Sequence, residues 1–313
     1  MAETDSLAAL YADFADLNME GGWHRKFPAL WPEPRHNFLP HAWHYRDVKP
    51  ILDRAGRLVD TQLAERRNLT MFNPVEGNIY STVRTIVAAY QMIRPGEVAR
   101  SHRHTPNALR LILEGRGTYT VVDGQQVEMR PGDVLLTPSW SWHSHFNSGA
   151  DDCYWMDFLD VPLVHLMEPM FYEPHPDGVE ADTVALDVAP IAFRWEDTLA
   201  ALTLEQERVG ANQPVSVRLG PAQLDTIRLD MLRIPAGCDT PALRTTANAI
   251  FAVVRGSGTS TIDGTTLDWS FGDTIAVPAW RPFSHHADED SILLQVCDAP
   301  VLEKLGWLRV ATA

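Results

Sequence analysis

Two closely spaced pairs of histidines are the residues of this chain best suited to chemistry. His102 and His104 stand at positions i and i+2, and His143 and His145 repeat that spacing. In a β-strand this spacing directs both side chains of a pair to one face. Neutral imidazole is a common ligand for transition metals. The two pairs are therefore candidates for one metal site, or for a set of buried, hydrogen-bonded histidines.

A frame of turn residues accompanies the histidines: Gly96, Gly132, Pro138 and Asn147. Gly96 lies six residues before His102, and His143 follows Pro138 by five. These spacings resemble the two motifs of the cupin superfamily, G-x5-H-x-H and G-x5-P-x-G-x2-H-x3-N. The resemblance implies that His102, His104 and His143 bind a metal ion. A metal-free barrel that keeps its histidines for hydrogen bonding is the alternative.

Two departures from the cupin motifs affect the predicted site. Trp140 stands where the second motif usually has glycine, and Ala108 and Leu109 stand where the first usually has a glutamate ligand. Three imidazoles without a carboxylate leave a divalent ion its full charge and up to three open positions. Fe, Zn, Cu and Ni all suit imidazole. An open site of this kind suits O2 activation by Fe(II), with a chelating dianion such as a 2-hydroxybenzoate balancing the charge.

Arg110 and His145 are the predicted catalytic side chains. Arg110 follows His104 by six residues, an even spacing that directs it to the same face of a regular strand. A cation inside a barrel needs a partner, which a substrate carboxylate would supply. The alternative is an internal ion pair with Glu97 or Glu114. His145 could accept a phenol proton or donate to bound oxygen.

Composition narrows the class of protein. The 313 residues carry a net charge of −15, which disfavours nucleic acid and anionic membranes as partners. The three cysteines are scattered, which favours a reduced, cytoplasmic location. The acidic N-terminal residues do not resemble a signal peptide, and no apolar run is long enough to predict a membrane span.

The chain divides by pattern into four parts. Residues 1–75 form an arm: an amphipathic helix over 1–20, a Trp- and Pro-rich segment over 21–45 that is predicted to pack on another surface such as a second subunit, and a helix over 48–55 ended by Gly56. Residues 76–160 form an N-terminal barrel with the metal site. Residues 161–215 form a connector with helices at 167–176 and 195–209. Residues 216–313 form a C-terminal barrel.

Short β-prone runs between Gly and Pro turns predict an all-β protein built from two antiparallel jelly-roll barrels. The predicted strands are 85–93, 109–113, 118–122, 126–130, 134–137, 153–159, 227–234, 250–254, 259–262 and 274–277. Asp123-Gly124 and Asp263-Gly264 are matching hairpin signals.

The two strand regions are copies of one another, which makes the chain a bicupin. Gly132-Asp133 and Gly272-Asp273 correspond, at an offset of 140 or 141 residues that also holds elsewhere. At this offset, His102, His104 and His143 correspond to Leu243, Thr245 and Phe283, whereas His145 corresponds to His285. Leu, Thr and Phe cannot hold a divalent ion, so the second barrel is predicted to be metal-free.

A more specific resemblance extends over about residues 40–310. Its motifs are Ala64-Glu65-Arg66-Arg67, Asn73-Pro74, Gln91, Pro95-Gly96-Glu97-Val98-Ala99, His102-Arg103-His104-Thr105, Ala108-Leu109-Arg110, Thr137-Pro138-x-Trp140-x-Trp142-His143-x-His145, Asp298-Ala299-Pro300-Val301 and Leu305-Gly306. These resemble gentisate 1,2-dioxygenase and its salicylate and 1-hydroxy-2-naphthoate relatives. The resemblance implies one Fe(II) per subunit on the three histidines. It also implies O2-dependent ring opening between the carboxyl-bearing and hydroxyl-bearing carbons, and homotetramers.

The same resemblance assigns substrate contacts. Arg110 and His145 would touch the substrate and Gln91 would line its pocket, with Arg66, Arg67 and Trp142 as further candidates. Val87 stands four residues before Gln91, where the family usually has Tyr or Trp. The pocket should therefore be roomier, which leaves gentisate, a 5-substituted salicylate such as nitrosalicylate, and 1-hydroxy-2-naphthoate open as substrates.

Two other classes of protein compete with this interpretation. Some cupins only bind ligands, and such a protein would not need open metal positions. A Zn- or Mn-dependent sugar isomerase would need the carboxylate ligand that is missing here.

Overall fold

The computed structural model describes residues 6–23, 30–34, 37–220 and 224–313. It divides into two compact units, residues 1–35 and 36–313. In the first unit, helix α1 (Leu7–Ala15) begins at Ser6, whose hydroxyl accepts a hydrogen bond from Ala9 N at 3.1 Å. The helix predicted over 1–20 is thus shorter at its C-terminal end, and residues 1–5 lie outside the described part, as do 24–29 and 35–36 of the Trp- and Pro-rich segment.

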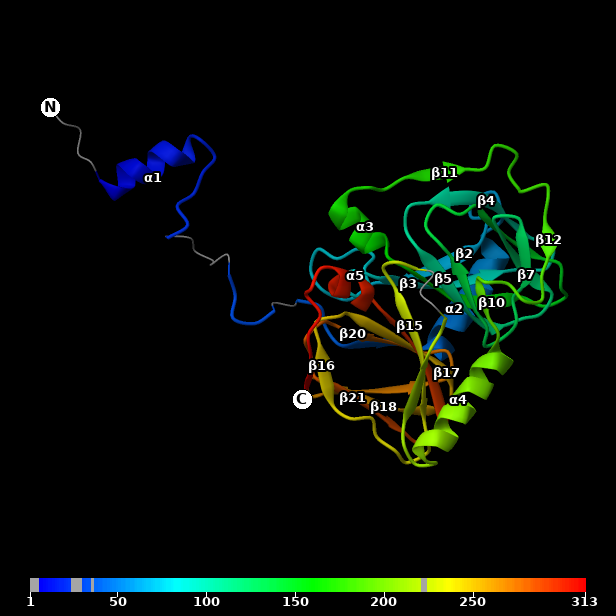
Figure 1. The fold of residues 1–313 in the computed structure, drawn as a ribbon. Coiled ribbons are helices and arrows are strands. Elements are labelled where there is room, and N and C mark those ends of the chain that lie inside the picture. The colour runs from blue at the N-terminus through cyan, green and yellow to red at the C-terminus, as the bar shows by residue number, and fades with distance from the viewer. Residues whose placement is uncertain (1–5, 24–29, 35–36, 221–223) are drawn as a thin grey trace. The chain divides into compact units, whose positions relative to one another are not determined.

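The second unit consists of two β-barrels stacked on one another (Figure 1), which confirms the predicted bicupin fold. The N-terminal barrel has two six-stranded sheets. The strands of the first follow the order β13 (Ala192–Phe193), β8 (Val134–Thr137), β5 (Ala108–Glu114), β10 (Cys153–Leu159), β3 (Val87–Ile93), β2 (Arg67–Met71). Those of the second follow the order β11 (Tyr172–Pro174), β4 (Val98–His104), β9 (His143–Asn147), β6 (Thr118–Val122), β7 (Gln125–Glu128), β12 (Val184–Ala185). Its pairings are antiparallel except between β12 and β7.

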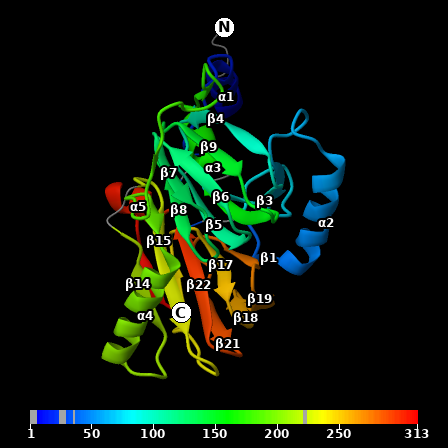
Figure 2. The same cartoon turned by 90° about the vertical axis from the view of Figure 1, so that its right-hand side faces the viewer.

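The C-terminal barrel repeats this arrangement. The strands of its six-stranded sheet follow the order β1 (His41–Trp43), β20 (Thr274–Val277), β17 (Ala249–Arg255), β22 (Ser291–Cys297), β15 (Arg228–Ile234), β14 (Val215–Arg218). Those of its five-stranded sheet follow the order β19 (Thr265–Ser270), β18 (Ser257–Ile262), β21 (Phe283–Ala287), β16 (Leu243–Thr245), β23 (Val310–Thr312). Figure 2 shows its long strands β15, β17 and β22 below those of the first barrel. Helix α5 (Ala299–Lys304) follows β22.

The predicted arm contributes strands to both barrels. β1 pairs with β20 of the C-terminal barrel, whereas β2 pairs with β3 of the N-terminal one. Helix α2 (Tyr45–Leu58) lies between these strands in sequence and runs through Gly56, which sequence reasoning had placed at its end. A Cβ on Gly56 would come within 2.8 Å of Met92 Cε. Gly56 therefore permits close packing of the helix on β3.

The connector also departs from prediction at one helix. Residues 167–176 are not helical: α3 (Val161–Met167) comes earlier and ends at Glu168, whose φ is 70°. The chain then forms β11, which pairs with β4. Three prolines, Pro169, Pro174 and Pro176, disfavour a helix there, and their effect outweighs the apolar spacing. The second predicted helix, α4 (Trp195–Val209), has the expected bounds.

Helices α2 and α4 connect the barrels in the same way. Tyr45 begins α2, and its backbone N donates to Asp273 Oδ1 of the C-terminal barrel at 2.7 Å. Trp195 begins α4, and its backbone N donates to Asp133 Oδ1 of the N-terminal barrel at 2.8 Å. Each helix then packs on the other barrel, α2 on β2 and β3, and α4 on β14 and β15. Both helices therefore hold the two barrels against each other.

The corresponding turns have matching backbones in the two barrels. Asp123 and Asp263 have φ of 45° and 48°, as expected for tight hairpins. Trp140 and Trp280, at the position that the cupin motif gives to glycine, have φ of 66° and 61°. An arginine guanidinium lies over each indole, with Arg103 4.5 Å from the Trp140 ring and Arg244 4.8 Å from that of Trp280. This cation–π contact accompanies a backbone conformation that is unfavourable for tryptophan.

Candidate active site

The three predicted metal ligands converge in the N-terminal barrel. β4 carries His102 and His104, and β9 carries His143 directly opposite His102. One ligand nitrogen from each residue lies within 4.8 Å of those from the other two. The ring centroids of His102 and His143 are 4.3 Å apart, and those of His104 and His143 are 4.9 Å apart. These three residues can hold one metal ion.

Backbone carbonyls orient the three rings. The Nδ1 atoms of His102, His104 and His143 lie 3.1, 2.8 and 3.1 Å from the carbonyl oxygens of Arg100, Pro106 and Ser141. Each Nδ1–H can therefore donate to a carbonyl, which leaves the Nε2 lone pair available for a metal.

Burial also favours the neutral imidazoles that a metal ion needs. It lowers the pKa of His102 to about 4, with Arg66 adding to the effect, and lowers the pKa of His104 and, more strongly, of His143. The donor set fits a divalent transition metal, because the rings are neutral and one ring nitrogen of each lies close to those of the other two.

His145 lies beside this cluster and is 1% exposed. Its ring centroid is 6.1 Å from that of His143 and 5.6 Å from that of Trp155. Neither of its ring nitrogens has a hydrogen-bond partner among the described residues. Burial, and then the nearby Arg110, hold its pKa well below the ordinary value. His145 is therefore a neutral imidazole free to exchange a proton with a ligand.

Arg110 is buried in β5 and forms an internal ion pair, although with neither glutamate named from the sequence. Its Nε lies 3.4 Å from Asp157 Oδ1, without the alignment of a hydrogen bond, and its Nη1 donates to Thr137 Oγ1 at 2.9 Å. Glu97 instead pairs with Arg67, and Glu114 with Lys49. The guanidinium has five N–H donors, so some remain available to a carboxylate ligand.

Asp157 is the site residue that sequence reasoning missed. It faces Arg110 across the pairing of β10 with β5 and is 3% exposed. Gln91 Nε2 donates to Oδ2, and Trp155 Nε1 donates to Oδ1 at 2.9 Å. The Gln91 amide oxygen in turn accepts from Arg66 Nε. An acid inside the apolar run 153–159 was the signal, because a charge buried in a strand needs a partner.

The other predicted substrate contacts differ in their placement. Val87 is buried four residues before Gln91 on β3, a spacing that puts both on one face, and Arg66 joins the network through Gln91. Arg67 instead donates to the backbone oxygens of Val59 and Gly56 and pairs with Glu97. It therefore has a structural role in tying β2 to α2.

Trp142 is only half-buried, and its described ring contacts are with the Arg103 guanidinium at 4.4 Å and the His175 ring at 4.8 Å. Those contacts do not include the four histidines. Its role in substrate binding stays a prediction.

Comparison with known proteins agrees with this geometry. Residues 89–161 match the family model described as "Cupin domain". A gentisate 1,2-dioxygenase from Streptomyces is 35% identical, with 99% of this chain and 96% of the relative covered. A 5-aminosalicylate 1,2-dioxygenase from Comamonas is 34% identical, with 98% and 90% covered.

A solved structure of similar fold is salicylate 1,2-dioxygenase from Pseudaminobacter salicylatoxidans. It has a TM-score of 0.89 and 30% identity, with 100% of this chain and 99% of that chain covered. The same enzyme has also been solved as adducts with gentisate. The fold and the histidine cluster thus define a bicupin dioxygenase that opens an aromatic ring. The chain belongs to the family of gentisate and salicylate 1,2-dioxygenases.

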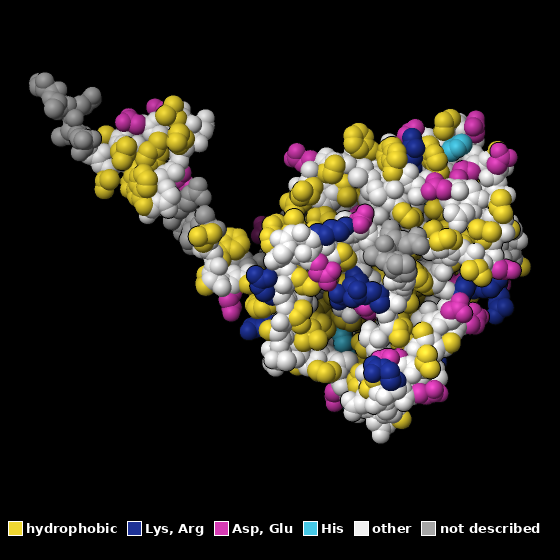
Figure 3. Space-filling view, in the orientation of Figure 1, with side chains coloured by type: hydrophobic (Ala, Val, Ile, Leu, Met, Phe, Trp, Pro, Cys, Tyr) yellow, Lys and Arg dark blue, Asp and Glu magenta, His cyan; other side chains and the backbone are white. Residues whose placement is uncertain are grey.

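No helix in the described ranges is long and apolar enough to cross a membrane. On the face shown in Figure 3, acidic and basic side chains of the second unit are interspersed with hydrophobic ones.

Proposed function

We propose that the protein is an Fe(II)-dependent dioxygenase that uses O2 to open a 2-hydroxybenzoate between its carboxyl-bearing and hydroxyl-bearing carbons. The observation that carries this proposal is the convergence of three neutral imidazoles beside the buried Arg110–Asp157 pair and an unpartnered His145. One Fe(II) held by His102, His104 and His143 would supply a chelation centre for the substrate and the electrons for oxygen activation. By its family, the enzyme is proposed to act as a cytoplasmic homotetramer.

Arg110 is proposed to bind the substrate carboxylate. Asp157 holds the guanidinium from one side and Thr137 from another, so its remaining N–H groups have a fixed direction. A carboxylate can accept two of them in parallel, which also fixes the plane of the ring. Gln91 and Trp155 keep the Asp157 carboxylate in place, so this orientation is set before substrate arrives.

His145 is proposed to take the phenol proton. A chelating phenolate requires that the hydroxyl lose its proton inside a buried site. His145 is neutral there, and its ring nitrogens lack protein partners among the described residues. The proton would move to a ring nitrogen of His145, where the nearby Trp155 ring restricts the position of the imidazole.

The substrate is proposed to carry a substituent on the salicylate ring. Relatives act on gentisate and on 5-aminosalicylate, both 2-hydroxybenzoates with a polar group at ring position 5, according to their names. Val87 supports this choice, since a small side chain stands at the position where the family usually has Tyr or Trp. A larger substituent than hydroxyl, such as nitro, therefore fits the proposal.

The test is anaerobic reconstitution with Fe(II), followed by oxygen uptake with gentisate, 5-aminosalicylate, 5-nitrosalicylate, salicylate and 1-hydroxy-2-naphthoate. We expect stoichiometric oxygen uptake and loss of the aromatic absorbance for at least one 5-substituted salicylate. Protein loaded with Zn(II) is the matched control and should be inactive. If Fe(II)-loaded protein binds these acids but consumes no oxygen, the chain is a ligand-binding cupin and the proposal is wrong.

A further inference from the structure

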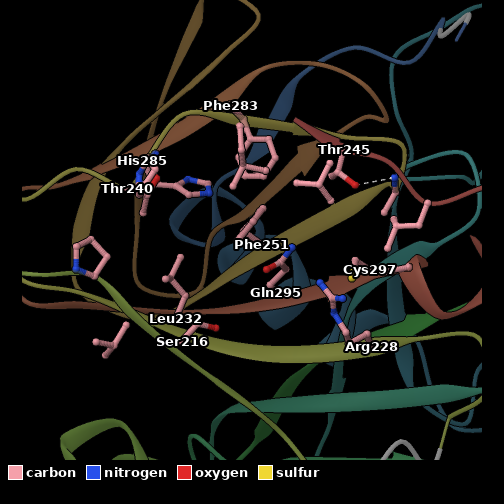
Figure 4. A pocket seen from close by; sticks show the side chains of 18 residues that line it. Ser216, Arg228, Leu232, Thr240, Thr245, Phe251, Phe283, His285, Gln295 and Cys297 are labelled. Carbon is pink, nitrogen blue, oxygen red and sulfur yellow. Dashed lines mark hydrogen bonds between the residues drawn. The ribbon is translucent and has the colours of Figure 1, made fainter. Parts of the chain in front are cut away.

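The C-terminal barrel encloses a cavity that the proposed reaction does not use. Its volume is about 320 Å³. One sheet contributes Leu232, Phe251 and Gln295, whereas the facing sheet contributes Phe283 and His285 (Figure 4). The cavity therefore lies between the two sheets, in the interior of the barrel.

This cavity corresponds, position by position, to the active site of the first barrel. The counterparts of the four histidines, namely Leu243, Thr245, Phe283 and His285, all line it. The strand register extends the match, since Gln295 faces Phe251 between β22 and β17 as Asp157 faces Arg110 between β10 and β5. Leu232 occupies the counterpart position of Gln91. At these equivalent positions, the charged and potential metal-binding side chains of the first barrel are replaced mostly by neutral or apolar ones.

The His285 ring is directed into the cavity and lacks a protein partner on one nitrogen among the described residues. His285 is 2% exposed, and its Nε2 has no hydrogen-bond partner among the described residues. Figure 4 shows its ring projecting among the lining side chains. A buried nitrogen of this kind is costly unless a ligand or water satisfies it.

The hydrogen bonds around Ser260 assign the proton of His285. Trp269 Nε1 donates to Ser260 Oγ at 3.0 Å, and Ser260 Oγ lies 2.7 Å from His285 Nδ1. Among the described residues the Ser260 hydroxyl proton has no acceptor other than Nδ1, so donation to Nδ1 satisfies it and places the proton of the neutral imidazole on Nε2. Burial lowers the pKa of His285 to about 4, which keeps the ring neutral. His285 thus presents one N–H donor to the cavity.

The charges at the edge of the cavity are already paired. Arg228 lines it, but its Nε donates to Asp230 Oδ2 at 2.8 Å and its Nη1 lies 3.5 Å from Glu303 Oε1. Two carboxylates thus already face Arg228, whereas one faces Arg110 in the first barrel, so an anionic ligand is less favoured here. An uncharged ligand is favoured.

Aromatic side chains from the two facing sheets meet beside the cavity. The ring centroid of Phe251 lies 5.7 Å from that of Phe283 and 4.3 Å from that of His285, and the Phe283 and His285 centroids are 5.6 Å apart. Such a cluster favours another aromatic ring in stacked or edge-to-face contact. At about 30 Å³ per water-sized group, the volume admits on the order of ten non-hydrogen atoms.

We propose that the C-terminal barrel is a second ligand site, which binds an uncharged single-ring aromatic molecule through a hydrogen-bond acceptor placed against His285. The ligand's carbonyl or similar oxygen accepts from Nε2, and its ring lies against Phe251 and Phe283. The site works without metal and is separate from ring cleavage.

Binding of three benzene derivatives to the iron-loaded full chain tests the proposal. Benzamide has an uncharged acceptor, benzoate is its charged counterpart of the same shape, and toluene has no acceptor. Titration calorimetry or ligand-detected NMR is run on the wild type and on Leu232→Trp, which fills the cavity. Leu204→Trp, at a 70% exposed position of α4, is the matched control. Only the binding that Leu232→Trp removes counts as binding to this cavity, because benzoate can also enter the first barrel.

We expect saturable benzamide binding that Leu232→Trp abolishes and Leu204→Trp preserves, with toluene about fivefold and benzoate at least tenfold weaker at this site. His285→Phe should weaken benzamide by about fivefold or more. His286→Phe, on the next residue, which pairs with Asp239 instead, should not. Oxygen uptake should be unchanged in both phenylalanine variants, which shows that they fold. Benzamide binding that is absent in the wild type, or equal in wild type and Leu232→Trp, overturns the proposal.

Discussion

At the scale of single residues, the site depends on two buried charges of opposite sign, Arg110 and Asp157, which lie against each other. Arg110 is 2% exposed and Asp157 3% exposed, and Gln91 and Trp155 complete the contacts of the acid. The guanidinium is thus held rigidly beside the histidine cluster. Two substitutions separate what this pair does for substrate from what it does for the fold.

Replacing Arg110 should damage catalysis and leave metal binding intact. A charge-assisted hydrogen bond contributes on the order of 1.5–3 kcal/mol, so Arg110→Ala should lower kcat/KM by roughly ten- to a hundred-fold or more. Arg110→Lys should restore only part of it, because an ammonium cannot make the paired contact. The comparison is made at matched iron content. Near-wild-type catalytic efficiency in Arg110→Ala would indicate that Arg66, the other cation of the network, binds the substrate carboxylate instead.

Replacing Asp157 should mainly lower the free energy of unfolding. Asp157→Asn keeps the shape and leaves an oxygen for Trp155, but it removes the counter-charge of a buried arginine. Breaking such a pair costs roughly 3–5 kcal/mol of unfolding free energy. A substrate carboxylate can supply the missing charge, so salicylate should raise the Tm of the variant more than that of the wild type. Equal Tm shifts in the two proteins would contradict a carboxylate site at Arg110.

The pH dependence of stability should involve His285. Its pKa is lowered to about 4 in the folded state, whereas an unfolded histidine titrates near 6.5. Between these values the unfolded chain binds the proton and the folded chain does not, so the stabilisation present above pH 6.5 is lost as the pH falls toward 4. His285→Phe should lose less stability than the wild type between pH 7 and pH 5, measured by denaturant unfolding. Identical losses would show that His285 is protonated when folded.

Among secondary-structure elements, the turns at Gly132-Asp133 and Gly272-Asp273 have a role that their motif does not reveal. The turn glycine lies under an aromatic ring in each: a Cβ would come 2.7 Å from Trp195 at Gly132 and 2.5 Å from Tyr45 at Gly272. These rings begin α4 and α2. The glycines are therefore required by helix docking as well as by their positive φ.

A pair of alanine substitutions separates these two requirements. Gly272 and Gly237 have φ of 80° and 71°, but a Cβ at Gly237 meets nothing within 4 Å. Gly237→Ala should therefore cost only the backbone strain, about 1 kcal/mol. Gly272→Ala should cost at least about 2 kcal/mol more, because it also displaces Tyr45. Chemical denaturation measures both, and equal losses would mean that the ring moves aside freely.

Sequence reasoning correctly predicted features that depend only on neighbouring residues, and it missed features that depend on a contact with a distant part of the chain. The i and i+2 histidines and the hairpin at Asp123 need only their neighbours, and both are found as expected. Asp157 was missed because its partner Arg110 becomes visible only through the strand register. Gly56 was misread as a helix stop because the Met92 side chain that requires it comes from another element.

For the whole molecule, the two barrels share a fold but differ in the chemistry of their interiors. The first brings together three imidazoles that can hold a metal ion, whereas Leu243, Thr245 and Phe283 stand at the equivalent positions of the second. The domain boundaries near residues 75, 160 and 215 stay a prediction.

Metal content should follow this difference. We expect about one iron per chain by elemental analysis, and loss of both iron and oxygen uptake in His143→Ala. Thr245→Ala, at the position equivalent to His104, should keep both. Two tightly bound irons per wild-type chain would contradict a single centre.

Pairing of β1 with β20 has a consequence for biosynthesis. The strand made near the start of translation completes a sheet whose other members are made last. On the ribosome, residues 41–43 therefore stay unpaired with this sheet until residues 274–277 emerge, after all the strands of the N-terminal barrel have been made. Expressed alone, residues 216–313 would leave the β20 edge uncovered, a surface prone to strand addition by other chains.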